Sequence, residues 1–226
     1  MWRFCMASDN ICIDLHVHSR FSRDSILSVE QIVRKYSKED IIPVICDHNS
    51  LEGSKNVNPL MKTISNDVPN ILAEEITTSE GEIIGIFLSD EIIPFKSARE
   101  TIKEIHNQGG LVILPHPFDQ FRKKCLADIS REALINQIDV IEGYNSRNLS
   151  KRSDETAIAY AKQFNKPVSA GSDAHTPFEI GNAWTEMELF GDPKEFLCNL
   201  EKAVYFHKPS GFGVHAITKM VKLVRS

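Results

Sequence analysis

Short apolar runs rich in Ile and Val alternate along this chain with longer segments whose apolar residues recur at helical spacing. Such alternation is typical of strand-helix units built around a largely parallel α/β sheet. The pattern predicts seven or eight strands, of which the clearest cover residues 11–17, 42–46, 70–76, 82–88, 111–114, 140–144 and 167–170. The predicted helices in this part of the chain cover residues 29–36, 98–108, 131–137 and 154–164.

The length of 226 residues suits one barrel-sized domain. We expect this domain to span residues 1–190 and a C-terminal helical extension, residues 191–226, to pack on it. The extension is predicted to contain a helix from Pro193 to about Val204 and another over residues 216–225. The second has an apolar face, which is typical of a helix that docks on a barrel, although a helix lying on a membrane surface has a similar pattern.

The net charge of -5 argues against a protein that mainly coats nucleic acid. It does not exclude a phosphorylated substrate, because carboxylates around metal ions make a sequence acidic while the loaded site is locally positive. The cysteines are odd in number, scattered and never paired as C-x-x-C, so we expect reduced thiols in a cytoplasmic protein. No apolar stretch is long enough to span a bilayer, and the first ten residues lack the apolar region of a signal peptide, so no membrane partner is expected.

Histidines and carboxylates follow several of the predicted strands. Asp14, His16 and His18 close the first strand at a spacing of two, which points their side chains to one face. Asp173 and His175 follow the last clear strand with the same spacing. Two such pairs are unlikely to arise by chance and indicate a metal site.

Three further strands end in potential ligands. His48 closes the second, the pair Glu74 and Glu75 lies at the end of the third, and His116 closes the fifth. In a barrel of parallel strands these ends converge on one rim, so residues far apart in the sequence would form one cluster. Mixed nitrogen and oxygen ligands suit Zn, Mn or Fe rather than Ca.

Five motifs in this order, H-x-H, D-H-N, E-E-I-T-T, L-P-H-P and G-S-D-A-H, resemble those of the PHP (polymerase and histidinol phosphatase) superfamily over roughly residues 11–190. The resemblance implies a distorted (β/α)7 barrel that holds two or three divalent metal ions. Its members include histidinol phosphatases, nucleotide phosphatases and exonuclease domains of bacterial replicative polymerases.

The resemblance also implies a ligand set. One metal would be held by His16, His18, Glu75 and Asp173, a second by Glu75 and His116, and a third by Asp24, His48 and His175. Many relatives add a histidine to the second metal in a pattern like H-I-L-G, where this chain reads Glu82-Ile83-Ile84-Gly85. Glu82 is therefore either a substituted ligand, which would favour Mn over Zn, or an outward-facing strand residue.

Two further aspartates adjoin the predicted ligands. We expect Asp14 to accept a ring N–H and so orient a histidine, as carboxylates behind metal ligands commonly do. Asp47 either does the same or is a simple turn residue. The histidines at positions 106, 207 and 215 lie outside the motifs and are not expected to bind metal.

Residues 141–147 resemble the I-E-x-x-N element of the family and place Asn145 and Arg147 at the rim of the site. The planar guanidinium of Arg147 matches phosphate oxygens, so Arg147 is predicted to grip the substrate phosphate. Arg20 is also assigned to substrate binding. Together with Arg23 and the run Arg122-Lys123-Lys124 it would add positive potential around the mouth.

The function that these residues predict is hydrolysis of a small phosphomonoester, such as a nucleotide or a sugar or amino-alcohol phosphate. A metal-bridging hydroxide held near Glu75 would attack phosphorus. Asp173 would hold the metal, Arg147 would stabilise the phosphate oxygens, and either His175 or a metal-bound water would protonate the leaving group. The alternatives are an exonuclease acting on short oligonucleotides and a non-catalytic metal-binding regulatory domain.

Overall fold

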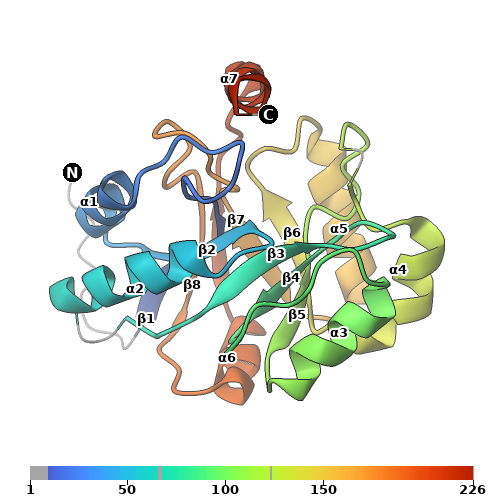
Figure 1. Cartoon of the computed structure of the whole chain (residues 1–226). Helices are drawn as coiled ribbons and strands as arrows, with labels where there is room; N and C mark the ends of the chain where they lie inside the picture. The colour runs from blue at the N-terminus through green and yellow to red at the C-terminus, as the bar shows by residue number, and fades with distance from the viewer. Residues whose placement is uncertain (1–9, 66–67, 123, 226) are drawn as a thin grey trace.

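The computed structural model describes residues 10–65, 68–122 and 124–225 (Figure 1). Cys5 and Lys123 lie outside the described residues. One sheet has the order β7-β6-β5-β4-β3-β2-β1-β8-β9. Its strands are β1 (Asn10–Val17), β2 (Ile42–His48), β3 (Ala73–Thr77), β4 (Glu82–Ile86), β5 (Leu111–Leu114), β6 (Val140–Asn145), β7 (Val168–Gly171), β8 (Ala183–Glu188) and β9 (Val204–His207). The helices are α1 (Val29–Glu39), α2 (Glu52–Ile64), α3 (Ala98–Asn107), α4 (Asp128–Leu134), α5 (Lys151–Gln163), α6 (Pro193–Leu200) and α7 (Phe212–Val224), with a short 3-10 helix η1 (Ile135–Gln137) after α4.

The sheet curls until β1 and β7 nearly meet. Near their carboxyl ends, the backbone N–H of His18 donates to the backbone oxygen of Ala174 at 3.0 Å. The N–H of Asp173 donates to the backbone oxygen of His16 at 2.7 Å. Strand β8 instead pairs antiparallel with β1 along its first half. The sheet is therefore a distorted, nearly closed barrel, which confirms the predicted fold class.

One strand runs against the predicted parallel pattern. Strand β4 is antiparallel to both β3 and β5. A tight turn joins β3 to β4, in which the N–H of Thr78 donates to the oxygen of Gly81 at 2.7 Å. Gly81 has a φ of +146°, a conformation that favours glycine. Because Glu82 pairs with Thr77, the first residue of β4 lies at the same rim as the last residues of the parallel strands.

Helices cover the outside of the barrel, with α1 and α2 on one side and α3, α4 and α5 on the other (Figure 1). Helix α3 shows why these segments are helical. Ser97 and Glu100 form a capping box at its start, and Ile102 and Ile105 are buried against the sheet, as their spacing predicts. The apolar residues of strands and helices thus close the core and leave the polar strand ends at one rim.

Helix α2 was not predicted. It contains Pro59, a residue that usually ends a helix, and its N-cap Leu51 makes no side-chain cap. Packing compensates, because Val57 and Met61 are buried against α1 and the neighbouring strands.

The segment after Asp192 contains the two predicted helices and, in addition, a strand. Helix α6 ends at Leu200, and β9 then pairs antiparallel with β8, where the indole of Trp184 stacks on Phe206 at 5.2 Å. Helix α7 begins at Phe212 and lies above the strand ends (Figure 1). Every helix in the described residues is too short or too polar to cross a membrane.

Candidate metal centre

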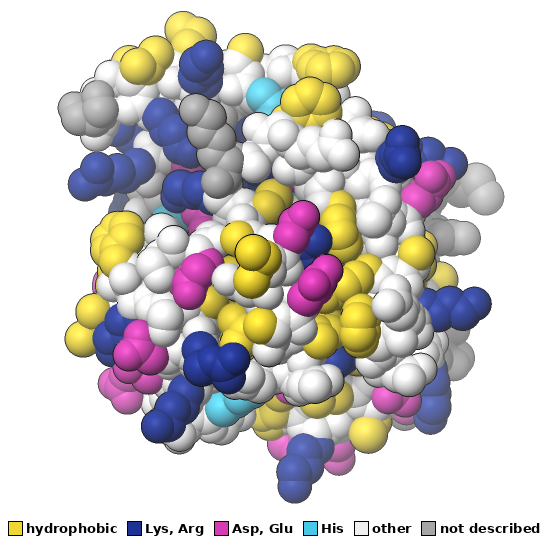
Figure 2. Space-filling model, turned by 90° about the vertical axis from the view of Figure 1, so that its right-hand side faces the viewer, with side chains coloured by type: hydrophobic (Ala, Val, Ile, Leu, Met, Phe, Trp, Pro, Cys, Tyr) yellow, Lys and Arg dark blue, Asp and Glu magenta, His cyan; other side chains and the backbone are white. Residues whose placement is uncertain are grey.

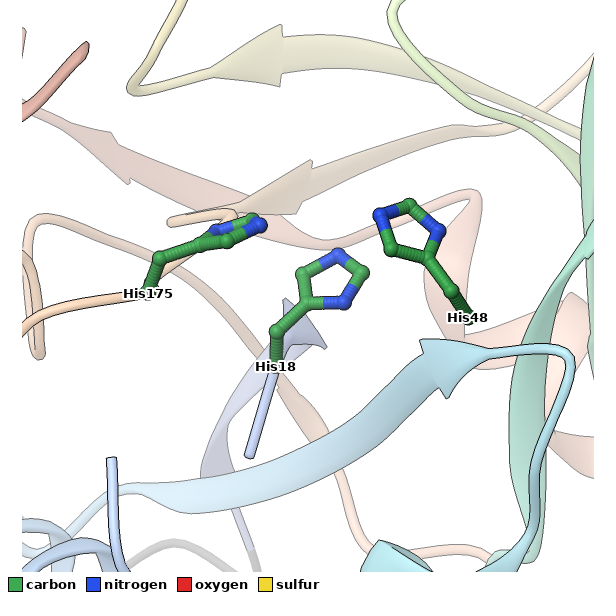
Figure 3. Close-up of side chains that lie close together, drawn as sticks. All are labelled: His18, His48 and His175. Atoms are coloured by element: carbon green, nitrogen blue, oxygen red, sulfur yellow. The ribbon is translucent and has the colours of Figure 1, made fainter. Parts of the chain in front are cut away.

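The structure brings the nine predicted ligands together at one rim of the barrel. His16 comes from β1, His48 from β2, Glu75 from β3 and Glu82 from β4, while the loops after β1, β5 and β7 provide the others, which are His18, Asp24, His116, Asp173 and His175. Seven of the nine, all except His16 and His116, line a cavity of about 480 Å³. Figure 3 shows His18, His48 and His175 converging from separate segments, with ring centroids of His18 and His175 4.3 Å apart.

The four side chains predicted to hold the first metal lie close together. The Nε2 atoms of His16 and His18 lie 3.0 Å apart. Nε2 of His18 lies 3.4 Å from Oε2 of Glu75 and 3.5 Å from Oδ1 of Asp173, and the corresponding distances from His16 are 3.7 and 3.8 Å. Bonds of 2.0 to 2.1 Å to one tetrahedral ion would separate neighbouring ligand atoms by about 3.3 to 3.4 Å. The five distances, 3.0 to 3.8 Å, are close to this spacing, so His16 and His18 fit one cation together with either carboxylate.

Glu75 directs its two oxygens to different neighbours. Oε2 faces the first group, whereas Oε1 lies 2.9 Å from Nε2 of His116. Oε2 also lies 3.1 Å from Nδ1 of His48, which is 3.6 Å from Oε1 of Glu82. The side chain of Glu82 thus points into the cavity rather than outward, beside His48 and Glu75. This arrangement allows Glu75 to bridge two ions.

A third group lies at the outer side of the cluster. Oδ1 of Asp24 is 3.4 Å from Nε2 of His175, and its Oδ2 is 3.5 Å from Nε2 of His48. Together with His18, both histidines form a set whose nitrogen atoms lie within 4.8 Å of one another. The residues predicted for a third metal are therefore close together, and His48 lies between this group and Glu75.

The ring of His16 is oriented by a carboxylate that the sequence left without a role. Nδ1 of His16 donates to Oε1 of Glu142 at 2.8 Å. A carboxylate only accepts, so the proton stays on Nδ1 and the lone pair of Nε2 faces the cluster. The prediction that Asp14 orients a ring is wrong for the described contacts, because its oxygens accept from the hydroxyl of Tyr36 and the N–H groups of His16 and Ser172.

The rings of His18 and His175 are oriented in the same sense. Nδ1 of His18 lies 3.0 Å from Oγ of Ser22, and that hydroxyl donates to Oδ1 of Asp47 at 2.6 Å. Asp47 therefore acts on His18 through Ser22. Nδ1 of His175 donates to the carbonyl oxygen of Asp173 at 2.8 Å. In both rings Nε2 is left free to bind a cation.

Two predicted ligands have an unusual backbone conformation. His116 and Asp173 have φ values of 33° and 52°, a region that costs a residue with a side chain about 1–3 kcal/mol. Hydrogen bonds hold both, since the N–H of His116 donates to Glu142 at 2.7 Å and that of Asp173 donates to His16. Gly171 is required nearby, because a Cβ there would lie 2.4 Å from the Cβ of His16.

The cluster has a strongly negative potential that favours a cation. Burial by itself lowers the pKa of His48, but the carboxylates of Glu75, Asp24 and Glu82 raise it to about 10. Oδ1 of Asp24 and Oδ1 of Asp173 are buried without a hydrogen-bond partner. Divalent ions would satisfy these atoms and displace the histidine protons, so the donor set fits metal ions.

Three cationic side chains contact the carboxylates of the cluster. Nζ of Lys124 lies 2.6 Å from Glu82, Nζ of Lys222 lies 2.7 Å from Asp24, and Arg122 contacts Asp173. Arg122 and Lys124 belong to the basic run that was predicted only to steer anions. Lys222 comes from α7, and the sequence analysis did not connect it with the site.

The residues predicted to bind substrate lie in different surroundings. Arg147 lines the cavity, but its Nε lies 3.0 Å from Glu179 and its Nη2 donates to Oγ1 of Thr218 at 2.6 Å. Asn145 is buried behind the rim, where its amide donates to Glu142 and to Asp173. Arg20 is exposed and is not among the described residues that line the cavity.

Helix α7 contributes four side chains to the cavity wall. These are His215, Thr218, Lys219 and Lys222. Along the helix these residues are three, one and three positions apart. The sequence placed Lys219 and Lys222 off the apolar face that was predicted to dock on the barrel, and it gave His215 no role at the metal site.

Comparison with known sequences identifies relatives of this chain. It is 35% identical over 196 residues to the uncharacterized protein MJ0417 of Methanocaldococcus jannaschii. The matched region covers 82% of this chain and 77% of that protein. A family model described as PHP-associated matches residues 151–204, from α5 to the first residue of β9.

Solved structures share the fold at low sequence identity. A two-domain protein of Bacteroides vulgatus that contains a predicted PHP-like metal-dependent phosphoesterase matches 88% of this chain with a TM-score of 0.72 and 18% identity. This chain covers 65% of that protein. A lesion-specific endonuclease of Pyrococcus furiosus matches 85% of this chain with a TM-score of 0.58 and 17% identity, and 56% of its own length is covered.

Proposed function

Because this chain belongs to the PHP superfamily, we propose that it is a metal-dependent phosphoesterase that hydrolyses a small phosphomonoester. The observation that carries the proposal is the close approach of Nε2 of His16 and His18 to Glu75 and Asp173, beside two further groups of ligands. A cluster built only for stability would not need a cavity in front of it, and seven of its nine members line one.

Two or three divalent ions would be held by the nine ligands. When bound, such ions supply a nucleophile by lowering the pKa of a water molecule, and they neutralise charge on the phosphate oxygens. Mixed imidazole and carboxylate ligands suit Mn, Zn or Fe. The carboxylate of Glu82 beside His48 favours Mn for the ion that it would contact.

The chain's own residues would position the substrate. Arg122 and Arg147 line the cavity on the side of Asp173, where their guanidinium groups would hold the phosphate oxygens in a bidentate manner. His175 has its Nδ1 proton bound to a backbone carbonyl and its Nε2 in the cavity. If two ions are bound and the third position is empty, Nε2 of His175 would take up a proton from water and pass it to the leaving group; if three are bound, His175 would be a ligand.

The size of the cavity favours a small substrate. A volume of about 480 Å³ lies within the usual range of roughly 300 to 1,000 Å³ for small-molecule sites. Helix α7 lies above the strand ends and limits access from that direction (Figure 1). A nuclease is the second candidate, because the endonuclease of Pyrococcus furiosus shares the fold.

The test is purification with Mn supplied, measurement of bound metal, and a screen of phosphomonoesters, dinucleotides and single-stranded oligonucleotides. We expect phosphate release from monoesters and at least two metal ions per chain. Binding of a monoester should depend only weakly on salt, whereas binding of an oligonucleotide would fall steeply. His18→Ala should abolish turnover and reduce bound metal.

Two outcomes would contradict the proposal. Metal binding without hydrolysis of any phosphoester would favour a non-catalytic metal-binding domain. Full activity of His18→Ala would show that the reaction takes place elsewhere in the molecule.

A further inference from the structure

The inner face of helix α7, which we call the roof, is polar and faces the metal centre. It consists of His215, Thr218, Lys219 and Lys222. In Figure 2, hydrophobic side chains lie at the top of the molecule, where Figure 1 places α7, and Lys and Arg side chains gather in the hollow below them. The roof therefore covers the ligand cluster with cationic and neutral polar groups.

The orientation of α7 is the reverse of that of an ordinary surface helix. Met220, Leu223 and Val224 point to solvent and are 68%, 72% and 85% exposed. An amphipathic helix usually buries its apolar stripe, so burial of these side chains does not hold α7 in place. Polar contacts do, including the bond from Arg147 to Thr218 and the bond from Arg225 to the backbone oxygen of Ser25.

One charged group and one polar atom of the roof lack a partner among the described residues. Within residues 10–65, 68–122 and 124–225, Lys219 forms no ion pair, although it lines the cavity. Nε2 of His215 is buried without a hydrogen-bond partner, and burial together with nearby Arg147 lowers the pKa of this ring. The free ammonium group of Lys219 can donate to an anionic acceptor, and so can His215 in the tautomer that carries its proton on Nε2.

The charge of the C-terminal segment supports the same conclusion. Residues 202–226 contain five Lys and Arg and no Asp or Glu, in a chain with a net charge of -5. Lys222 contacts Asp24 at the edge of the metal centre and leaves Lys219 as the uncommitted cation. The two lysines of the roof thus carry one more positive charge than the carboxylate of Asp24 neutralises.

We propose that the roof binds a second anionic group of the substrate, separate from the phosphoester that is cleaved, and that Lys219 is its main ligand. The inference rests on the proposed phosphoesterase function and narrows its substrate class to phosphoesters that carry another phosphate or a carboxylate. Amino-alcohol phosphates are excluded, because their ammonium group would face Lys219 and Lys222.

The test compares phosphoesters that have no second charged group, a second anionic group or a cationic one. The native protein is assayed with four compounds. These are adenosine monophosphate, adenosine with phosphates on its 3′ and 5′ positions, a dinucleotide with a terminal phosphate, and phosphoethanolamine. We expect kcat/KM to be highest for one of the two substrates with a second phosphate and lowest for phosphoethanolamine. Which of the two is preferred distinguishes a second monoester from a diester linkage.

The variants address Lys219 directly. We define the preference for a second phosphate as the ratio of kcat/KM with and without that phosphate. Lys219→Ala should reduce this ratio about tenfold, and Lys219→Arg should retain most of it. The matched control is Lys194→Ala, since Lys194 is an exposed lysine of α6 at the opposite end of the molecule. An unchanged preference in Lys219→Ala, or a native preference for phosphoethanolamine, would overturn the inference.

A binding measurement separates this inference from the proposed function. Calorimetric titration of the same nucleotides into the His18→Ala variant gives the preference as a ratio of Kd values without turnover. If binding to the variant shows a preference that depends on Lys219, while the native protein hydrolyses none of the compounds, only the proposed function is contradicted. Hydrolysis without any such preference would contradict only the role of the roof.

Discussion

The two walls of the cavity are built in opposite ways. The floor, which comprises the nine predicted ligands at the strand ends, is almost entirely buried, and several of its side chains are held by a partner behind them, as His16 is by Glu142. The roof lies on a helix in which only Val214 and Thr218 are buried. The floor is therefore preorganised by the barrel, whereas the roof is attached through a few polar contacts.

This difference indicates that the two walls have separate roles. Ligand positions in the floor are tied to strand ends, so they change only if the barrel changes. The roof can change its charge without disturbing the core, because Lys219 and Lys222 contribute no buried apolar surface. Chemistry would then reside in the floor and substrate selectivity in the roof, and the following experiments test that separation.

The largest effect should come from a floor ligand. Asp173→Asn removes the charge of an oxygen that lies 3.5 Å from His18 and is buried without a hydrogen-bond partner. We expect kcat to fall by about 10³-fold or more, because several kcal/mol of transition-state stabilisation depend on the metal ions. Steady-state kinetics and elemental analysis of bound metal measure this effect. An active, metal-replete Asp173→Asn would show that the floor is not the catalytic wall.

Removal of metal should destabilise the whole barrel. Ions that bind the folded state at a hundredfold excess over Kd stabilise it by about 2.7 kcal/mol. For a chain of this size we expect a chelator to lower Tm by roughly 5 to 10 °C, and re-addition of Mn to restore it. Calorimetry with and without the chelator gives the value. A Tm that does not respond to metal would mean that the floor is rigid without ions.

Glu142→Gln should weaken the floor less than loss of a direct ligand does. The amide can still contact Nδ1 of His16, but it carries no charge and can present its nitrogen to the ring. Loss of such a partner typically costs 10- to 100-fold in metal affinity, so we expect a rise in Kd of about thirtyfold. Competition with a coloured chelator measures it. Asp139→Asn, outside the cluster, is the control and should leave the metal Kd unchanged.

Salt should produce the smallest effect and should act on the roof alone. Lys219 is exposed, so raising KCl from about 0.05 M to about 0.5 M should reduce the preference for a second phosphate about threefold. The metal Kd should change less, because the ligands of the floor are buried and poorly screened. Equal salt dependence of both quantities would contradict the contrast between the two walls.

The sequence predicted most of the floor because most ligands lie next to a local pattern, whereas Asp24 and Glu82 were implied only by the family resemblance. His16 and His18 follow an apolar run of strand length, and Asp173 and His175 follow another, so the strand ends could be located without knowing the fold. The seven clear strands lie within a few residues of their predicted positions. Helix α2 was missed because Pro59 weakens its local signal, and β9 because four residues carry little periodicity.

Other features depended on contacts that no local pattern encodes. Glu142 holds a ring 126 positions away in the sequence. Glu82 reaches the floor only because β4 runs antiparallel, so that its first residue pairs with the last residue of β3. The sequence left this residue open between a ligand and an outward-facing side chain, since strand direction is set by pairing and not by composition.

The sequence by itself determined which segments are strands, which residues end them, and hence the residue types of the metal centre. Only the tertiary structure decided what lies opposite that centre. An amphipathic pattern states that a helix has two faces, but it does not state which face is buried. In α7 the polar face turned inward, because the closed barrel presents Arg147 and Asp24 to Thr218 and Lys222.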